Sequence, residues 1–277
     1  MSPTNSSAHL PKPPSLARVG LMIPSSNTMM EVDFARDLPP GTALHTARMY
    51  MEDTTPAGEN RMLDEFALPA ARDLGTARPD VVVFGCTSAG ALRGNDYDAQ
   101  LCQRISELTG APVVSTIGAV RTAIEASGAA SIGVITPYVD ELNEKIKDSI
   151  EADGTDVAAI TGLGITDNFQ IAEVGPDEIV AFAVEALGPL AVEGNIDLIF
   201  ASCTNFGAMA VRPVITERLG LPVVTSNQAV LDAAIARLRA LWSPPPSTMS
   251  RPAATTRRCA CWPGPPRKPG SWPAGRA

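Results

Sequence analysis

The chain contains the same strand-and-cysteine unit twice. RPDVVVFGCTSAG around Cys86 and NIDLIFASCTNFGAM around Cys203 each lead an apolar strand into a small residue and then Cys-Thr. Each unit continues through a helical stretch to a second apolar run, APVVSTIGAV in one copy and LPVVTSNQAV in the other. The upstream glycines Gly20 and Gly133 are 113 residues apart and the two cysteines are 117 apart, so the copies stay nearly in step. This self-similarity predicts two copies of one α/β unit, each with one cysteine.

From residue 18 onward, short β-branched runs alternate with longer stretches of helical spacing. The predicted strands are 19–23, 43–49, 81–84, 113–115, 131–135, 156–161, 198–201 and 223–225. The predicted helices include 59–74, 98–108, 118–126, 139–152, 176–187, 209–218 and 227–241. Nearly continuous Val and Ile runs between helices are typical of parallel sheets covered on both faces. We therefore predict an α/β fold with a parallel sheet of about four strands in each half.

Charge and composition exclude several classes of protein. The net charge is −8, and because the last 35 residues hold six Lys or Arg and no Asp or Glu, the first 242 residues carry −14. Such an acidic body argues against nucleic-acid binding. No apolar run approaches the roughly 20 residues that span a bilayer, and no basic segment followed by an apolar one opens the chain, so we expect a cytoplasmic protein that does not enter a membrane.

The ends of the chain differ from its body. The first 15 or so residues are polar and proline-rich, and the last 35 are rich in Pro and Arg. We predict that both ends are disordered, because neither composition can build a core. A basic interaction tail and an appendage unrelated to the folded body both fit the last segment.

Both Cys-Thr motifs fall at carboxyl ends of strands, where ligands of parallel sheets bind. A helix starting there would offer free N–H groups and a positive end, which bind carboxylates and lower a thiol pKa from about 8.5. We therefore predict two functional thiols, Cys86 and Cys203. The alternative is that each is a small buried hydrophobe, which is our interpretation of Cys102 in its helical stretch. The five cysteines are too widely spaced for a disulfide or zinc framework.

Other strand ends add polar groups. Ser25 and Asn27 follow the first strand, Tyr138 follows the equivalent strand of the second half, and Asn168 follows the strand after that. Each is a candidate ligand contact, with a helix N-cap or an ordinary surface loop as the alternative. Neither G-x-x-x-x-G-K-[ST] nor G-x-G-x-x-G is present, so nucleotide binding has little support. With only two histidines, of which we expect His45 to be structural, no metal site is indicated.

The chain resembles the aspartate/glutamate racemase superfamily over about residues 18–241, and within it the maleate isomerase and arylmalonate decarboxylase branch. The motifs that carry the resemblance are VGLMIPSSNTMMEVDF, FGCTSAG, TPY and ASCTNFGA. PSSNT together with two Cys-Thr motifs is most similar to maleate isomerases. Arylmalonate decarboxylases have glycine in place of the first cysteine, so Cys86 argues against that activity.

The resemblance implies two α/β domains related by pseudo-twofold symmetry, with an active site in the cleft between them and no cofactor. The first domain would be residues 18–126 plus 226–242, because the last helix packs back on it, and the second would be 127–225. Residues 1–17 and 243–277 would be disordered ends. Members of the superfamily are often dimers, so a homodimer is also implied.

The resemblance further implies roles for residues. Cys86 would be a nucleophile or base, and Cys203 the opposing acid or base. The residues expected to bind the substrate carboxylates are Ser25, Asn27, Thr87, Ser88, Tyr138, Asn168, Thr204 and Asn205. The leading hypothesis is cis-trans isomerisation of a small, maleate-like enedioate. Racemisation of aspartate, glutamate or a hydantoin, decarboxylation of an arylmalonate-type acid, and non-catalytic binding of a dicarboxylate remain open.

Overall fold

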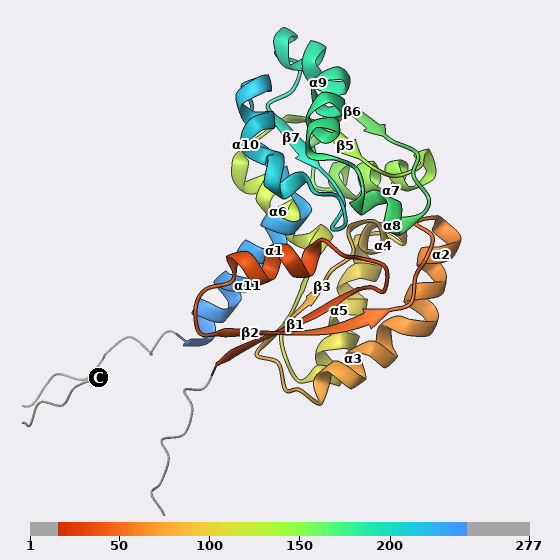
Figure 1. Cartoon of the computed structure of the whole chain (residues 1–277), viewed down its shortest axis with the longest axis vertical. Coiled ribbons are helices and arrows are strands. Elements are labelled where there is room, and N and C mark those ends of the chain that lie inside the picture. The colour runs from red at the N-terminus through yellow and green to blue at the C-terminus, as the bar shows by residue number, and fades with distance from the viewer. Residues whose placement is uncertain (1–15, 243–277) are drawn as a thin grey trace, which may run out of the picture. The chain divides into compact units, whose positions relative to one another are not determined.

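Two four-stranded parallel sheets organise residues 16–242, which are the residues that the computed structural model describes. The first sheet has the order β2-β1-β3-β4 and the second the order β6-β5-β7-β8 (Figure 1). The strands of the first sheet are β1 (Ala17–Pro24), β2 (Thr42–Met49), β3 (Val81–Phe84) and β4 (Val113–Ser115). Those of the second are β5 (Ser131–Thr136), β6 (Asp156–Gly162), β7 (Leu198–Ala201) and β8 (Val223–Thr225). The identical strand order confirms the duplication, and the predicted fold class is correct.

The helices pack around these sheets. They are α1 (Met30–Asp37), α2 (Pro56–Arg61), α3 (Ala67–Gly75), α4 (Thr87–Leu92), α5 (Asn95–Thr109), α6 (Thr116–Ser127), α7 (Asp140–Glu151), α8 (Asn168–Ala172), α9 (Pro176–Glu193), α10 (Ala208–Leu219) and α11 (Ser226–Trp242). The 3.6-residue apolar period did not reveal α1, α4 or α8, because helices of eight residues or fewer show too little of it, although a helix beginning after Cys86 was expected from the Cys-Thr motif. Between residues 16 and 242, no helix has the length and apolarity that crossing a membrane requires.

The single helix predicted over residues 59–74 is interrupted. Between α2 and α3, the segment η1 (Met62–Phe66) forms a wider π-helical turn. Pro69 explains the interruption, because it lacks a backbone N–H and its ring crowds the carbonyl of Glu65, four residues earlier. The turn lets the helical stretch run on to Gly75 despite the proline.

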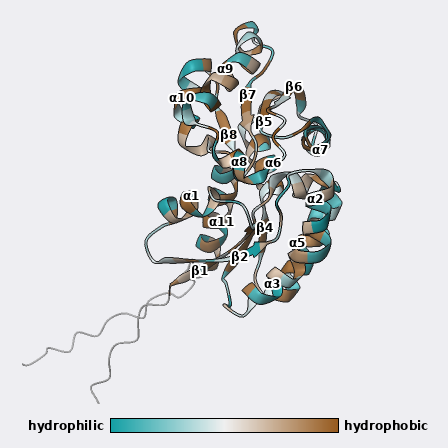
Figure 2. Cartoon of the chain, turned by 45° about the vertical axis from the view of Figure 1, so that its right-hand side comes forward, coloured by the Kyte–Doolittle hydropathy of each residue, from teal (hydrophilic) through white to brown (hydrophobic). Residues whose placement is uncertain are grey.

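The cores of the two halves are built alike. Figure 2 shows β7 in apolar brown, whereas α3 and α5 carry teal and brown along the same helix, as expected of helices with one buried face. A Cβ atom at Gly20 would lie 2.9 Å from Leu74 Cδ2, and one at the equivalent Gly133 would lie 2.8 Å from Leu187 Cδ2. In each half, a glycine on the central strand therefore admits a leucine from the covering helix.

The last helix packs against elements of both sheets. Helix α11 contacts α1, α6, β3 and β4 as well as β8, and Figure 1 shows it in blue beside the red α1. Helix α11 thus contacts elements of both halves, and the domain bounds expected from the resemblance stay a prediction. The two predicted disordered ends lie outside the described residues except for residues 16 and 17, and Ala17 already belongs to β1.

Gly85, directly before Cys86, should be intolerant of any side chain. A Cβ atom there would lie 2.8 Å from the carbonyl oxygen of Met22 and 2.7 Å from Met30 Sδ. Because β1 backbone blocks the space, we expect Gly85→Ala to lower the free energy of unfolding by about 1–3 kcal/mol in urea titrations. The control is Gly188→Ala in α9, where the nearest atom would be 3.9 Å away. That helical substitution should stabilise by about 0.5–1 kcal/mol. Equal stability of Gly85→Ala and wild type would contradict the packing argument.

Candidate active site

The structure brings the two cysteines of the repeated units together. Cys86 follows β3 and immediately precedes α4, and Cys203 lies two residues after β7. Both are free thiols, 4% and 6% exposed respectively. They are close enough for negative charge on Cys203 to raise the pKa of Cys86. The carboxyl ends of the two sheets therefore face one another at a buried site.

The expected lowering of the thiol pKa values is wrong. Burial raises the pKa of Cys86 well above its ordinary value, and the carboxyl of Glu59 raises it further, against a hydrogen bond from the Ala89 N–H. Burial likewise raises the pKa of Cys203 to about 11. The backbone donors that the sequence indicated are present, but the loss of water around a charged sulfur outweighs them. Both cysteines are therefore thiols at neutral pH.

Cys203 is nevertheless surrounded by hydrogen-bond donors. The Asn205 N–H lies 3.3 Å from Cys203 Sγ. The Tyr138 hydroxyl and the Phe206 N–H also bond the sulfur and oppose the rise of its pKa. The backbone of Cys203 has φ 97°, a region that favours glycine, so the thiol is held in place against local strain. This environment can hold a thiolate that forms transiently.

Hydrogen bonds cross between the two Cys-Thr turns. The Thr87 hydroxyl donates to Ser226 Oγ at 2.9 Å, and the Cys203 N–H donates to the same oxygen at 3.1 Å. In the other direction, the Thr204 hydroxyl donates to the carbonyl oxygen of Gly85 at 3.2 Å. All of these residues are at least nine-tenths buried. The sequence did not single out Ser226, because a serine at the start of a helix has an ordinary role as a cap.

The predicted asparagine contacts are engaged with the protein. Asn27 Oδ1 accepts hydrogen bonds from the N–H groups of Met29 and Met30, and its Nδ2 donates to Thr204 Oγ1 at 3.0 Å. Asn27 therefore bonds the N–H of Met30, the first residue of α1, although the N-cap position itself is Met29. Asn205 Oδ1 accepts from the Thr28 N–H at 2.9 Å and its Nδ2 donates to the carbonyl oxygen of Asn168 at 2.5 Å. These amides join the first and second halves.

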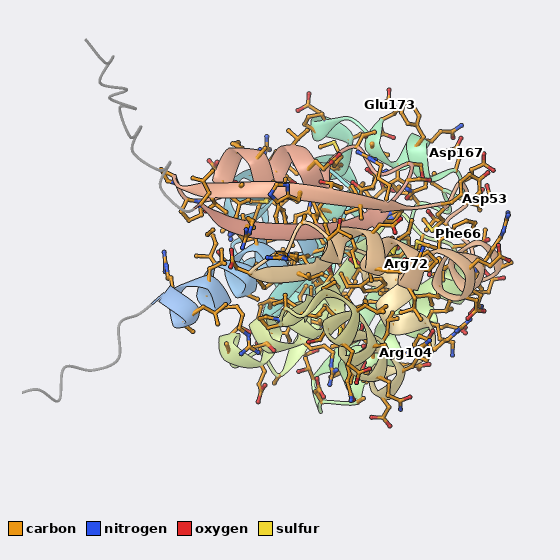
Figure 3. The ribbon with its side chains drawn as sticks, turned by 90° about the horizontal axis from the view of Figure 1, so that it is seen from below. Asp53, Phe66, Arg72, Arg104, Asp167 and Glu173 are labelled. Atoms are coloured by element: carbon orange, nitrogen blue, oxygen red, sulfur yellow. The ribbon has the colours of Figure 1, made fainter. Side chains whose placement is uncertain are left out.

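The predicted contacts Asn168 and Ser25 make hydrogen bonds that connect the loops around the two cysteines. Asn168 Nδ2 donates to Ser26 Oγ at 2.8 Å, and Asn168 Oδ1 accepts from the Thr54 hydroxyl at 3.0 Å. Ser25 Oγ accepts from the Met51 N–H at 3.0 Å. The loops also meet through an antiparallel bridge between Asp53 and Asp167, which Figure 3 shows at the same edge of the molecule. This crossing of loops, together with the burial of both thiols, closes the site.

Glu59, at the start of the predicted helix 59–74, is the site residue that sequence reasoning missed. It lies in α2, is fully buried, and its Oε1 accepts a hydrogen bond from the Ser88 hydroxyl. Its Oε2 has no hydrogen-bond partner among the described residues. Burial raises its pKa to about 8, against the effect of the Ser88 hydrogen bond. Acidic residues are ordinary in the first turn of a helix, so the sequence carried no signal.

Histidine takes no part in this site. His45 lies within β2, in register with Gly20, and His9 lies outside the described residues. Within residues 16–242, no three His, Cys, Asp or Glu side chains group so as to hold a metal ion.

Two parallel α/β halves that each contribute a cysteine to a shared site define a protein of the Asp/Glu racemase superfamily. A model of the arylmalonate decarboxylase family matches residues 19–245. The chain belongs to this family, which is a family of enzymes and includes maleate isomerases. The resemblance seen in the sequence motifs is thereby confirmed.

The similar proteins include both maleate isomerases and an arylmalonate decarboxylase. The maleate isomerase of Geobacillus stearothermophilus is 29% identical over 222 residues, which cover 76% of this chain and 86% of that protein. The arylmalonate decarboxylase of Bordetella bronchiseptica is 27% identical over 211 residues, with coverage of 76% and 86%. Among solved structures, maleate isomerase from Pseudomonas putida with maleate is similar, with a TM-score of 0.73 at 25% identity over 80% of this chain and 92% of that one.

Replacing Ser226 by alanine should loosen the junction between the two turns. Ser226→Ala leaves the Thr87 hydroxyl and the Cys203 N–H without their shared acceptor, which should lower the free energy of unfolding by about 1–3 kcal/mol. Ser202→Ala is the matched control, because Ser202 Oγ is buried at the end of the neighbouring strand β7 and has no hydrogen-bond partner among the described residues. Urea titrations should show Ser202→Ala close to wild type. Equal losses in both variants would contradict this account of Ser226.

The raised pKa of Glu59 predicts a pH dependence of stability. Between the ordinary carboxyl pKa and about 8, the folded protein keeps a proton that the unfolded chain releases. The free energy of unfolding therefore falls as pH rises from about 5 to 8, by at most about 1.4 kcal/mol per pH unit for this one group. Glu59→Gln should remove this contribution in urea titrations at each pH.

Asp98→Asn is the control for this measurement. Burial raises the pKa of Asp98 to about 6, so this variant should flatten the curve only below about pH 6. Parallel stability curves for Glu59→Gln and wild type from pH 5 to 8 would refute the assignment.

Proposed function

We propose that the protein catalyses cis-trans isomerisation of a small enedioate of the maleate class, using two cysteines and no cofactor. The observation that carries the proposal is the pair of buried thiols, Cys86 and Cys203, that face each other at the strand ends. Relatives named maleate isomerase support the substrate class. Glycine would stand at position 86 if the site were built like that of an arylmalonate decarboxylase.

In the proposed reaction, Cys86 is the nucleophile. Its sulfur, as thiolate, forms a C–S bond to one alkene carbon, and the π electrons move to the neighbouring carbon and its carboxylate. The Cys203 thiol gives its proton to that neighbouring carbon, which leaves a saturated thioether and a Cys203 thiolate. The central bond is now single and rotates. Cys203 then takes back the proton, the C–S bond breaks towards Cys86, and the trans product leaves.

The surroundings of the two sulfurs support this division of roles. At neutral pH Cys203 is protonated, because its pKa is raised to about 11, and so it can act as an acid. Once it has given its proton, the Tyr138 hydroxyl and the N–H groups of Asn205 and Phe206 are in place to stabilise the thiolate. Cys86 has fewer donors, which suits a sulfur that must attack and later leave.

The substrate carboxylates would be held by the polar groups at the strand ends. The candidates remain Ser25, Asn27, Thr87, Ser88, Tyr138, Asn168, Thr204 and Asn205. Several of their hydroxyls and amides already bond one another, so substrate binding exchanges protein hydrogen bonds for hydrogen bonds to carboxylate. Because both cysteines are almost fully buried, the loops bridged at Asp53 and Asp167 must part to admit a substrate.

Activity against a panel of maleate, an arylmalonate, L-aspartate and L-glutamate tests this function. Cys86→Ala should lose more than about a thousandfold of the maleate isomerase activity, measured by NMR of fumarate. Cys102→Ala, which changes a cysteine of α5, should retain it. Full activity of Cys86→Ala on maleate would end the proposal, as would deuterium exchange at the amino-acid α-carbon with no turnover of maleate.

The covalent step has its own test. Cys203→Ala lacks the acid that completes addition and the base that reverses it, so a thioether on Cys86 should form slowly and persist. Mass spectrometry of the digested protein after incubation with maleate should find one added maleate on the Cys86 peptide and none in Cys86→Ala.

A further inference from the structure

Glu59 is a buried carboxyl group that the steps above do not use. It reaches the site from α2, where no part of it is exposed to solvent. The Ser88 hydroxyl donates to its Oε1, and Ser88 Oγ lies 4.0 Å from Cys86 Sγ, at the outer limit of a hydrogen bond to sulfur. The three side chains therefore form a continuous line from carboxyl to thiol.

A purely structural role does not account for this arrangement. The Oε2 atom of Glu59 is buried without a partner, and an unpaired buried polar atom costs about 1–3 kcal/mol. A glutamine or an apolar side chain would avoid the desolvation of a carboxylate. The position next to the Cys86 thiol gives the carboxyl a chemical use.

We propose that Glu59 holds the proton of Cys86, with Ser88 as the bridge, so that the pair shares one proton and one negative charge. The Cys86 S–H bond breaks as its proton passes to Ser88 Oγ, while the Ser88 O–H bond breaks as that proton passes to Glu59 Oε1. The result is a Cys86 thiolate, an intact Ser88 hydroxyl and a neutral Glu59 carboxylic acid. When the thiolate leaves the substrate, the protons return by the same path. The role in turnover rests on the proposed function of Cys86.

The groups that face Glu59 favour a single shared charge. Cys86 lies before α4, Tyr138 follows β5 and Cys203 follows β7, and the carboxyl of Glu59 raises the pKa of each. Arg93 pairs with Asp64 and donates to Asn60 Oδ1 of α2 rather than to Glu59. Two negative charges in this surrounding repel each other, so the pair ionises in two separate steps.

The test follows the reactivity of Cys86 with iodoacetamide against pH, by mass spectrometry of its peptide. In wild type the alkylation rate should rise about tenfold per pH unit and then level off near pH 8, where Glu59 loses its proton and the single charge is shared. In Glu59→Gln the rate should keep rising through pH 8, because no carboxylate competes for the charge. Asp98→Asn should follow wild type.

Several outcomes would overturn the proposal. Superimposed profiles of wild type and Glu59→Gln would do so, and if Glu59→Gln does not fold, so would a wild-type profile that rises through pH 8 without levelling. Glu59→Asp keeps a carboxyl and should keep the levelling. Because alkylation requires no substrate, these outcomes are independent of whether the protein isomerises an enedioate.

The bridge is tested by turnover of maleate. Glu59→Gln and Ser88→Ala should each lower kcat by about 10²–10⁴-fold, the range of a general acid-base contribution. The double variant should lose no more than either single variant, because both interrupt one path. Additive losses would show that Ser88 does not connect the two groups. Absence of wild-type turnover, with the levelling near pH 8 intact, would refute the proposed function and leave the shared proton standing.

Discussion

The position of both thiols depends on the buried hydrogen bonds that cross between the two Cys-Thr turns. Polar groups at this depth are costly unless paired, and each half supplies partners that the other lacks. Ser226 serves both turns, and Thr204 reaches the carbonyl of Gly85 beside the opposite cysteine. The contact between the halves and the candidate site are thus one network. A change that weakens their association also moves the sulfurs.

The second constraint is the absence of positive charge. No Lys or Arg is buried among residues 16–242, whereas Glu59 and two thiols lie together in the site. An anionic ligand bound at this site would then be held by hydroxyl and N–H dipoles, and it would be compatible only with acidic side chains that stay neutral. Desolvation raises the pKa of Glu59, Cys86 and Cys203. It therefore keeps these groups protonated until an acceptor for the proton is in place.

Much of the fold could be read from the sequence, because the duplication and the buried Val and Ile runs are strong patterns. Both sheets, and the positions of Cys86 and Cys203 at equivalent strand ends, follow from them, whereas the cleft that brings the two cysteines together was implied by the family resemblance. Other features depend on three-dimensional context that spacing does not contain. The short helix α4 has no visible period, the burial of Glu59 depends on how α2 packs against α4, and the thiol pKa values depend on how completely the loops exclude water. The sequence indicated the backbone N–H donors near the thiols. It could not show that burial raises the thiol pKa values by more than these donors lower them.

The left-handed backbone of Cys203 bears on how such a protein evolves. Glycine adopts φ 97° without the strain that a side chain suffers, so stability alone favours its loss of a sulfur. Under the proposed function, selection for the chemistry keeps cysteine at this position despite the strain. In a gene copy released from that selection, drift towards glycine at position 203 would stabilise the fold and abolish the reaction. The result would be a more stable relative with the same architecture and no catalytic activity.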